Sequence, residues 1–159
     1  MEHSFNDTFM KRAVELSEMA IDSNKGGPFG AVIVKDGTII GEGCNMVTST
    51  NDPTAHAEMV AIRNACSAES AFHLEGCEIY TSCEPCPMCL SAIYWAHIDI
   101  IYYANSHKDA EFIDFSDSFI YREVRLKPGE RSIPMIPAEN RDAIKVFMKW
   151  KEKEDKIPY

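Results

Sequence analysis

The chain has 159 residues, of which 45% are hydrophobic and 26% are charged, as is typical of one soluble globular domain. Its formal net charge of −9 disfavours the counterion release on which nucleic-acid binding depends, so a small substrate is expected rather than DNA or RNA. We find neither the basic and apolar regions of a secretory signal nor a run approaching the roughly 18 apolar residues of a membrane span. A cytoplasmic protein with six reduced cysteines is therefore expected.

The first part of the chain predicts a helix followed by a β-hairpin. Apolar residues recur on one helical face over residues 5–22. The glycine-rich stretch 26–30 interrupts this helix, because glycine permits backbone conformations that other residues resist. Two strands, 31–34 and 38–42, follow and are joined by an Asp-Gly pair, which is a strong hairpin signal.

The rest of the chain predicts helices that alternate with strands. The expected elements are a loop over 48–54, a helix from 54–56 to about 68, a strand over 77–81, a helix over 86–95, a strand over 98–103 and a helix over 140–154. Such alternation favours a sheet with helices on both faces. No linker divides the sequence convincingly, so we predict one domain over residues 1–159.

One histidine and two cysteines have the spacing of a metal site. Cys86 and Cys89 are three residues apart at the start of a predicted helix, which places both sulfurs on one face. The unpaired N–H groups of the first turn favour the thiolate form that zinc requires. His56 would come from the neighbouring helix as a third ligand. Three protein ligands leave the fourth position of a catalytic zinc open to water.

Glu58 is the predicted proton carrier beside this site. Two thiolates cancel the charge of zinc, so we expect bound water to be less acidic than at an all-histidine site. A dedicated base then matters more, and Glu58 is placed to supply it. A histidine, a nearby glutamate and a C-x-x-C pair form the signature of zinc deaminases, which remove an amino group from a heterocyclic base by hydrolysis.

Cys83 leaves other interpretations open. With Cys86 and Cys89 it forms a C-x2-C-x2-C run, which is similar to part of an iron–sulfur motif or to a closed Cys3His structural zinc site. Pro85 disfavours helical backbone at the preceding residue, so Cys83 is expected to lie before the helix and point elsewhere. An open catalytic site is the favoured interpretation, with structural zinc and redox chemistry as alternatives.

Three segments of the chain, residues 26–34, 51–58 and 80–89, resemble the cytidine deaminase-like superfamily. Residues 117–121 and the terminal Tyr159 are similar to the small bacterial guanine deaminases within it. This resemblance implies a three-layer α/β/α sandwich around a mixed five-stranded sheet. It also implies hydrolysis of guanine to xanthine and ammonia, in which zinc hydroxide attacks C2 of the purine and Glu58 transfers protons.

By position, the resemblance assigns one zinc to His56, Cys86 and Cys89, and it also assigns the substrate contacts. Asn45 matches a base-binding asparagine, whose amide suits the O6/N7 edge of a purine. Phe29 would stack on the ring, and Asp117 would accept from the substrate amino group. The set of predicted substrate contacts is Phe29, Asn45, Ala57, Asp117 and Tyr159. Without the resemblance, Asn45 would be interpreted as a turn residue, Phe29 as part of the core, and Asp117 as a helix cap or a solvated acid.

The C-terminal segment, about residues 138–159, is expected from the resemblance to close the active site of its own subunit or of a partner. A homodimer with exchanged C-terminal elements follows from that expectation. The alternatives are a guanosine or other nucleoside or nucleobase deaminase, a tRNA adenosine deaminase and a non-catalytic structural zinc module. The acidic net charge argues against tRNA as the substrate.

Overall fold

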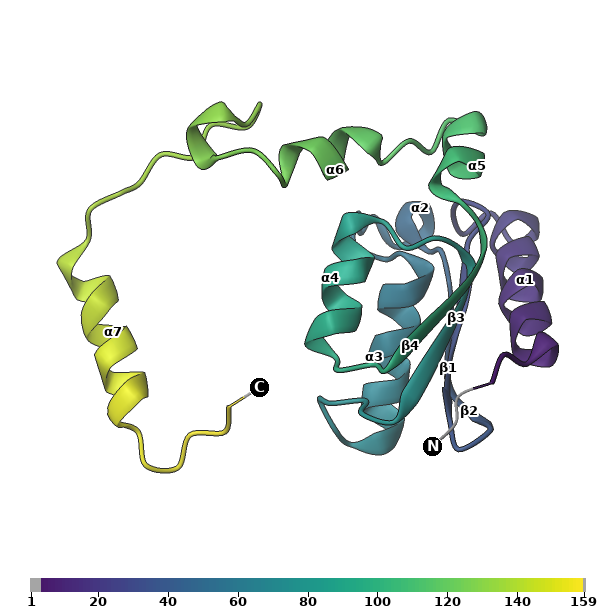
Figure 1. Ribbon diagram of the computed structural model, residues 1–159, viewed down its shortest axis with the longest axis horizontal. Coiled ribbons are helices and arrows are strands. Elements are labelled where there is room, and N and C mark those ends of the chain that lie inside the picture. The colour runs from purple at the N-terminus through teal and green to yellow at the C-terminus, as the bar shows by residue number, and fades with distance from the viewer. Residues whose placement is uncertain (1–3, 159) are drawn as a thin grey trace. The chain divides into compact units, whose positions relative to one another are not determined.

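The computed structural model describes residues 4–158, which fall into two compact units that meet between residues 118 and 119 (Figure 1). The elements of the first unit are α1 (Asp7–Asp22), β1 (Gly30–Lys35), β2 (Thr38–Cys44), α2 (Val47–Thr50), α3 (Ala57–Glu69), β3 (Cys77–Cys83), α4 (Pro87–Trp95), β4 (Ile100–Asn105) and α5 (His107–Phe112). Helix α6 (Ser118–Glu123) spans the boundary, and the second unit continues with a 3₁₀ turn (Pro128–Glu130) and α7 (Arg141–Glu152). Between residues 4 and 158, no helix is long and apolar enough to cross a membrane.

The sheet is mixed, as expected, and has the strand order β2-β1-β3-β4. Strand β1 pairs antiparallel with β2 and β3, whereas β3 and β4 are parallel. The expected fifth strand is wrong for the residues described, which form four. Directly after β4, a capping box between Ser106 and Asp109 turns the chain into α5. Pro134 and Pro137, in the segment before α7, have no backbone N–H group to donate to a neighbouring strand, which disfavours a further strand there.

Helices cover both faces of the sheet, which confirms the three-layer α/β/α prediction (Figure 1). Alternate residues of β1 serve the two faces, because side chains along a strand point to opposite sides. Val32 and Val34 pack with α1, while Ala31 and Ile33 pack with α3 and α4. The buried run of β1 is therefore apolar without interruption.

Local signals predicted most of the elements but missed the short helices α2, α5 and α6. Asp36 and Gly37 both have positive φ, of 48° and 74°, as the tight hairpin signalled by Asp-Gly requires. The expected loop over 48–54 instead overlaps the short helix α2, whose C-cap, Asn51, has the left-handed conformation. Four residues are too few to show a helical period, so this helix has no sequence signature.

Helix α3 lies unusually close to strand β2. A Cβ atom at Gly43 would lie 2.2 Å from the carbonyl oxygen of Ala57, and one at Gly41 would lie 2.6 Å from that of Ala61. Only glycine permits such an approach of strand to helix backbone. Gly41 and Gly43 therefore set the short distance between β2 and the backbone of α3, including the first turn of the helix.

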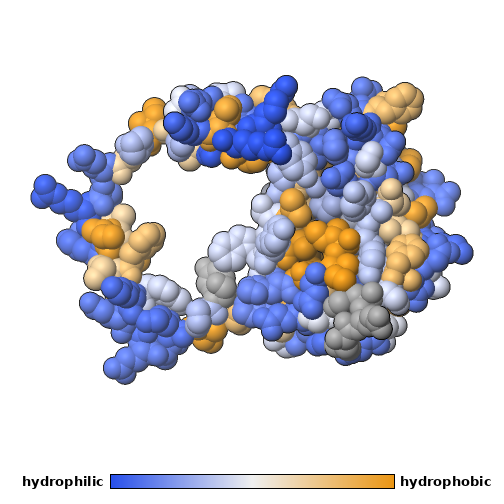
Figure 2. All heavy atoms as spheres, viewed as in Figure 1, coloured by the Kyte–Doolittle hydropathy of each residue, from blue (hydrophilic) through white to orange (hydrophobic). Residues whose placement is uncertain are grey.

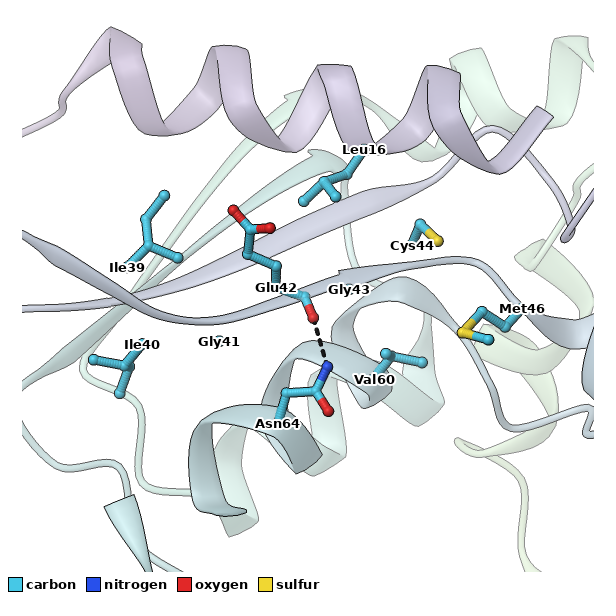
Figure 3. A pocket seen from close by; sticks show the side chains of 10 residues that line it. All are labelled: Leu16, Ile39, Ile40, Gly41, Glu42, Gly43, Cys44, Met46, Val60 and Asn64. Carbon is cyan, nitrogen blue, oxygen red and sulfur yellow. Dashed lines mark hydrogen bonds between the residues drawn. The ribbon is translucent and has the colours of Figure 1, made fainter. Parts of the chain in front are cut away.

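Strand β2 forms one edge of the sheet, and its outer side borders a groove of about 570 Å³ between α1 and α3 (Figure 3). Asn64 of α3 donates from Nδ2 to the carbonyl oxygen of Glu42, as the dashed line in Figure 3 shows. A β-bulge at Ile40 shifts the register of the same strand. Both features protect an edge strand against pairing with another chain.

An ion pair joins α1 to this edge, and it leads to a prediction about pH. The guanidinium of Arg12 donates two hydrogen bonds to Glu42, at 2.7 and 2.8 Å, which lowers the pKa of the Glu42 carboxyl. A lowered carboxyl pKa stabilises the fold above the unfolded-state value of about 4.3, and the contribution is lost as pH falls below it. Both side chains are about one-third exposed, so Glu42→Gln is expected to lower the unfolding free energy by no more than about 1 kcal/mol at pH 7.

This prediction is checked by urea unfolding of wild type and Glu42→Gln at pH 7 and at pH 3.5. The difference between the two proteins should be largest at pH 7 and should shrink at pH 3.5. A difference that grows on acidification would contradict the sign of the effect.

The second unit carries the predicted C-terminal helix. Asn140 caps α7 by accepting from the backbone N–H groups of Asp142 and Ala143. No residue of α7 is buried within the chain, and Ile144, Val146 and Phe147 are exposed. Figure 2 shows apolar side chains at the surface of this segment.

Candidate active site

The predicted metal ligands lie at the N-terminal ends of two helices. His56 is the N-cap of α3 and Cys86 is the N-cap of α4, while Cys89 lies in the first turn of α4. Neither cap residue makes a side-chain hydrogen bond to its own helix, so the side chains are available for other partners. Both helices begin with extended backbone and then present their positive ends, which favour thiolates nearby.

The three side chains form a cluster whose potential ligand atoms all lie within 4.8 Å of one another. Nδ1 of His56 lies 3.5 Å from Sγ of Cys86 and 3.6 Å from Sγ of Cys89. Tetrahedral zinc bonds to sulfur at about 2.3 Å and to nitrogen at about 2.0–2.1 Å, which separates the two donor atoms by about 3.6 Å. The donor types and their spacing therefore fit a zinc ion.

In the absence of a cation, the contact between the two thiols favours the thiolate form of one and the protonated form of the other. The pKa of Cys86 falls to about 4, chiefly because the Cys89 thiol donates a hydrogen bond to it and also because of His56. The same contact with Cys86, together with burial, raises the pKa of Cys89. A divalent cation between the sulfurs would stabilise both thiolates at the same time.

Glu58 is brought to the cluster by the first turn of α3. Its side chain is buried, and its carboxyl group interacts electrostatically with Cys86, His56 and Cys89. Burial raises the pKa of Glu58 to about 6. A carboxyl group whose pKa lies near neutrality can both accept and release a proton.

Cys83 does not join the cluster. It ends β3, and its Sγ lies 3.6 Å from the carbonyl oxygen of Ser106. Burial raises the pKa of its thiol to about 11, which disfavours the thiolate. Within residues 4–158, the group of His56, Cys86 and Cys89 is the one set of three or more side chains that could hold a metal. All six cysteines are free thiols.

Asn45 is buried at the end of β2 and is tied to the glycine-rich loop. Its backbone N–H donates to the carbonyl oxygen of Phe29 at 2.9 Å, and its Oδ1 accepts from the backbone N–H of Gly27 at 3.3 Å. The ring of Phe29 meets the ring of Phe115 edge to face, with centroids 5.1 Å apart. Phe115 was not anticipated from the sequence, because it lies in an irregular segment with no periodic pattern.

Asp117 and Ala57 are also in this region of the first unit. Oδ1 of Asp117 is buried without a hydrogen-bond partner among the described residues. Desolvation raises the pKa of Asp117, and the charge of Cys86 acts in the same direction. A buried acceptor without a donor is costly, so this oxygen is suited to a ligand N–H group. Ala57 is fully buried as the first residue of α3. Tyr159 lies outside the described residues.

A polar turn that the sequence did not single out fixes the position of His56. Oδ1 of Asp52 accepts from both the backbone N–H and the hydroxyl of Thr54, at 2.8 and 2.7 Å. The carbonyl oxygen of Thr54 then accepts from the backbone N–H of His56 at 2.8 Å. This is an Asx turn, which local Asp and Thr residues can signal even without a structure.

Loss of one cluster thiol should release zinc. Cys89→Ala is expected to weaken zinc binding more than about 100-fold, because a buried ligand is lost and not merely reoriented. Competition with a chromogenic chelator measures this affinity. Cys66→Ala, which removes a thiol outside the cluster, is the matched control and should bind zinc like wild type. Equal affinity in Cys89→Ala and wild type would exclude Cys89 as a ligand.

Comparison with known proteins identifies the family of the chain. Residues 3–105 match the model of the cytidine and deoxycytidylate deaminase zinc-binding region. Guanine deaminase of Bacillus subtilis is 51% identical over 154 residues, which are 97% of this chain and 99% of that protein. The X-ray structure of guanine deaminase from Bacillus subtilis superposes with a TM-score of 0.94 at 50% identity, over 100% of this chain and 99% of that one.

A more distant relative matches part of the chain. The tRNA-specific adenosine deaminase of Aquifex aeolicus is 42% identical over 96 residues, which are 60% of this chain and 63% of that protein. The family model covers both helix starts that carry the metal cluster. The chain belongs to the cytidine and deoxycytidylate deaminase zinc-binding family.

Proposed function

We propose that the protein hydrolyses guanine to xanthine and ammonia. The observation that carries this proposal is a three-ligand cluster with a buried glutamate beside it, in a chain that aligns with 99% of a guanine deaminase. The reaction consumes one water molecule, replaces the amino group at C2 by oxygen and releases ammonia. It therefore needs a nucleophilic water and a group that moves protons.

His56, Cys86 and Cys89 would hold one zinc ion per chain. A zinc ion bound by three protein ligands supplies an open position at which the pKa of water is lowered. The cluster supports this assignment by its donor atoms and by their spacing of 3.5 and 3.6 Å. The single cluster among the described residues supports a stoichiometry of one zinc ion per chain.

Glu58 would carry the protons of the reaction. Its carboxylate would take a proton from the attacking water and deliver it to the ring nitrogen next to C2, and a second transfer would protonate the departing amino group. The burial of Glu58 beside Cys89 supports this role, since proton transfer is efficient only at hydrogen-bond distance and away from bulk water.

Four described residues would position the purine. Asn45 would donate to the O6/N7 edge, and Phe29, braced edge to face by Phe115, would stack on the ring. Asp117 would accept from the amino group through its unpartnered Oδ1. Ala57, at the buried start of α3, would also contact the substrate. Tyr159 is proposed as a contact on the basis of the resemblance alone.

We further propose that residues 1–159 act as one functional domain in a homodimer. In this arrangement the segment from about residue 138 to 159 closes an active site, either its own or that of the partner subunit. Large apolar side chains that the chain leaves exposed support an assembly, since Tyr94 and Trp95 of α4 are 75% and 65% exposed. A cytoplasmic location remains a prediction from the sequence.

The proposed activity is tested by incubating the zinc-loaded full-length protein with guanine, guanosine, cytosine, adenine and tRNA, and by measuring released ammonia. Guanine should be the fastest substrate. The likeness to a tRNA-specific adenosine deaminase makes tRNA the second candidate, although a net charge of −9 disfavours it. Activity confined to cytosine, adenine or tRNA would overturn the guanine assignment.

A further inference from the structure

Glu84 lies between β3 and α4, and its side chain binds the first residue of α5. Its Oε2 accepts a hydrogen bond from the backbone N–H of His107 at 3.0 Å and lies 2.8 Å from Nδ1 of the same residue. A carboxylate only accepts hydrogen bonds, so we assign a proton to Nδ1, which donates to it. These two contacts, from one residue to one carboxylate oxygen, form the Glu84–His107 clasp.

The clasp connects the approach to the metal cluster with the start of α5. Strands β3 and β4 are parallel neighbours, and Cys83 at the end of β3 pairs with Asn105 at the end of β4 (Figure 1). The N–H of Glu84 then donates to the carbonyl oxygen of Asn105 at 2.8 Å. Glu84 precedes the proposed zinc ligand Cys86 by two residues. The clasp therefore joins the two chain segments directly after the paired strands.

Little of α5 is buried against the rest of the first unit. All six of its residues are described, and only Ala110 is buried. The capping box of Ser106 and Asp109 stabilises the helix itself, because both partners belong to its own first turn. Sγ of Cys83 also lies 3.6 Å from the carbonyl oxygen of Ser106, but a thiol is a weak donor. Since short helices are held mainly by packing, the placement of α5 depends strongly on the clasp.

The segment after α5 follows the position of this helix. The N–H of Phe115 donates to the carbonyl oxygen of Ala110 at 2.9 Å. The ring of Phe115 meets that of Phe29 with centroids 5.1 Å apart. Two residues further on, Oδ1 of Asp117 is buried without a hydrogen-bond partner in the part of the chain that is described. A displacement of α5 would therefore move Phe115 and Asp117 relative to the metal cluster.

We propose that the Glu84–His107 clasp is a positioning device for the reaction: through α5 it holds Phe115 and Asp117 at their distance from the metal cluster. This inference rests on the proposed function. Glu84 and His107 do not touch the substrate in this role. The contacts that they position form in the ground state as well as in the transition state, so losing the clasp weakens substrate binding more than it slows the chemical step.

His107→Ala removes the side-chain donor of the clasp. Ammonia release from guanine is measured over a range of concentrations with the zinc-loaded full-length protein, and zinc content is measured on the same samples. KM should rise about tenfold, while kcat per bound zinc should fall by less than about threefold. Partial misfolding or zinc loss would instead lower the apparent kcat and leave KM unchanged. An unchanged KM therefore overturns the inference.

A conservative variant and a control separate positioning from packing. In His107→Asn the side-chain Nδ2 can donate from near the position of Nδ1, so KM should return to within about threefold of wild type. His97→Asn is the matched control. His97 also lies beside a glutamate, with Nδ1 3.8 Å from Oε1 of Glu75, but it follows the far end of α4, and asparagine tolerates its φ of 56°. A KM in either variant as high as in His107→Ala counts against the clasp.

If His107→Ala fails to fold, Glu84→Gln decides. Its neutral amide oxygen accepts more weakly than a carboxylate, so KM should rise at least about threefold, and an unchanged KM overturns the inference.

Hydrogen exchange supplies a readout that needs no activity. The backbone amides of residues 108–117 should exchange about tenfold faster in His107→Ala than in wild type, while those of α3 should not change. A wild type inactive on guanine refutes the proposed function, and equal exchange of residues 108–117 would then refute the clasp as well. An active wild type whose His107→Ala variant keeps its KM refutes only the clasp.

Discussion

Glu58→Gln is expected to lower turnover on guanine by on the order of 10³-fold while zinc remains bound, since general acid–base catalysis contributes about 10²–10⁴-fold. Glutamine fills the same space and retains an acceptor beside Cys89, but it cannot take a proton from water. The three ligands, at the starts of α3 and α4, are unchanged by the substitution. The zinc content should therefore stay at the wild-type level while the turnover falls.

The measurement is ammonia release together with zinc content of the same sample. Glu69→Gln is the matched control, because Glu69 ends the same helix and pairs with Lys35 rather than with the cluster. It should keep wild-type turnover. Near wild-type turnover of zinc-loaded Glu58→Gln would remove Glu58 from the reaction.

Gly43→Ala is expected to produce the largest effect on stability and also to weaken zinc binding. The added Cβ would lie 2.2 Å from the carbonyl oxygen of Ala57 and 2.5 Å from the backbone nitrogen of Ala61, so β2 and α3 must separate. Overpacking of this kind costs about 1–3 kcal/mol, and backbone atoms cannot rotate away as a side chain can. The first turn of α3 moves with the helix, and it carries both His56 and Glu58.

Urea unfolding and chelator competition measure the two consequences. We expect the unfolding free energy to fall by about 2 kcal/mol and the zinc affinity to fall with it. Gly129→Ala serves as the control, since open space surrounds Gly129. A Gly43→Ala protein with wild-type stability would show that the close approach of β2 to α3 is not needed.

Local sequence patterns were sufficient for most of the first unit. The periodicity of residues 5–22 and the apolar run of β1 predicted a helix and a buried strand, and both are present as α1 and β1. Such patterns act within a few residues, so they can be read without knowing the fold. They missed the short helices α2, α5 and α6, which hold too few turns to show a period. The fifth strand, which the described residues do not form, was expected from the resemblance and not from a local pattern.

Some residues of the candidate site could likewise be predicted from local sequence patterns, and others could not. Cys86 and Cys89 lie on one helical turn, so their spacing predicted a pair of neighbouring sulfurs. Phe115 and the glycines of β2 had no such signal, because their partners come from remote parts of the chain. The roles of the individual site residues remain proposals that the variants above can test.

The sequence by itself determined which chemical groups the chain has for a zinc site and favoured hydrolytic deamination. Residue types indicate it, because one imidazole, two thiols at helical spacing and one nearby carboxylate form the signature of zinc deaminases. Tertiary structure decided how these groups meet. It brought Nδ1 of His56 to 3.5 Å from Sγ of Cys86, left Cys83 outside the cluster and fixed the amide of Asn45 against two backbone donors. Distances and hydrogen-bond directions between remote segments arise only when the sheet and helices pack, so no local pattern could have given them.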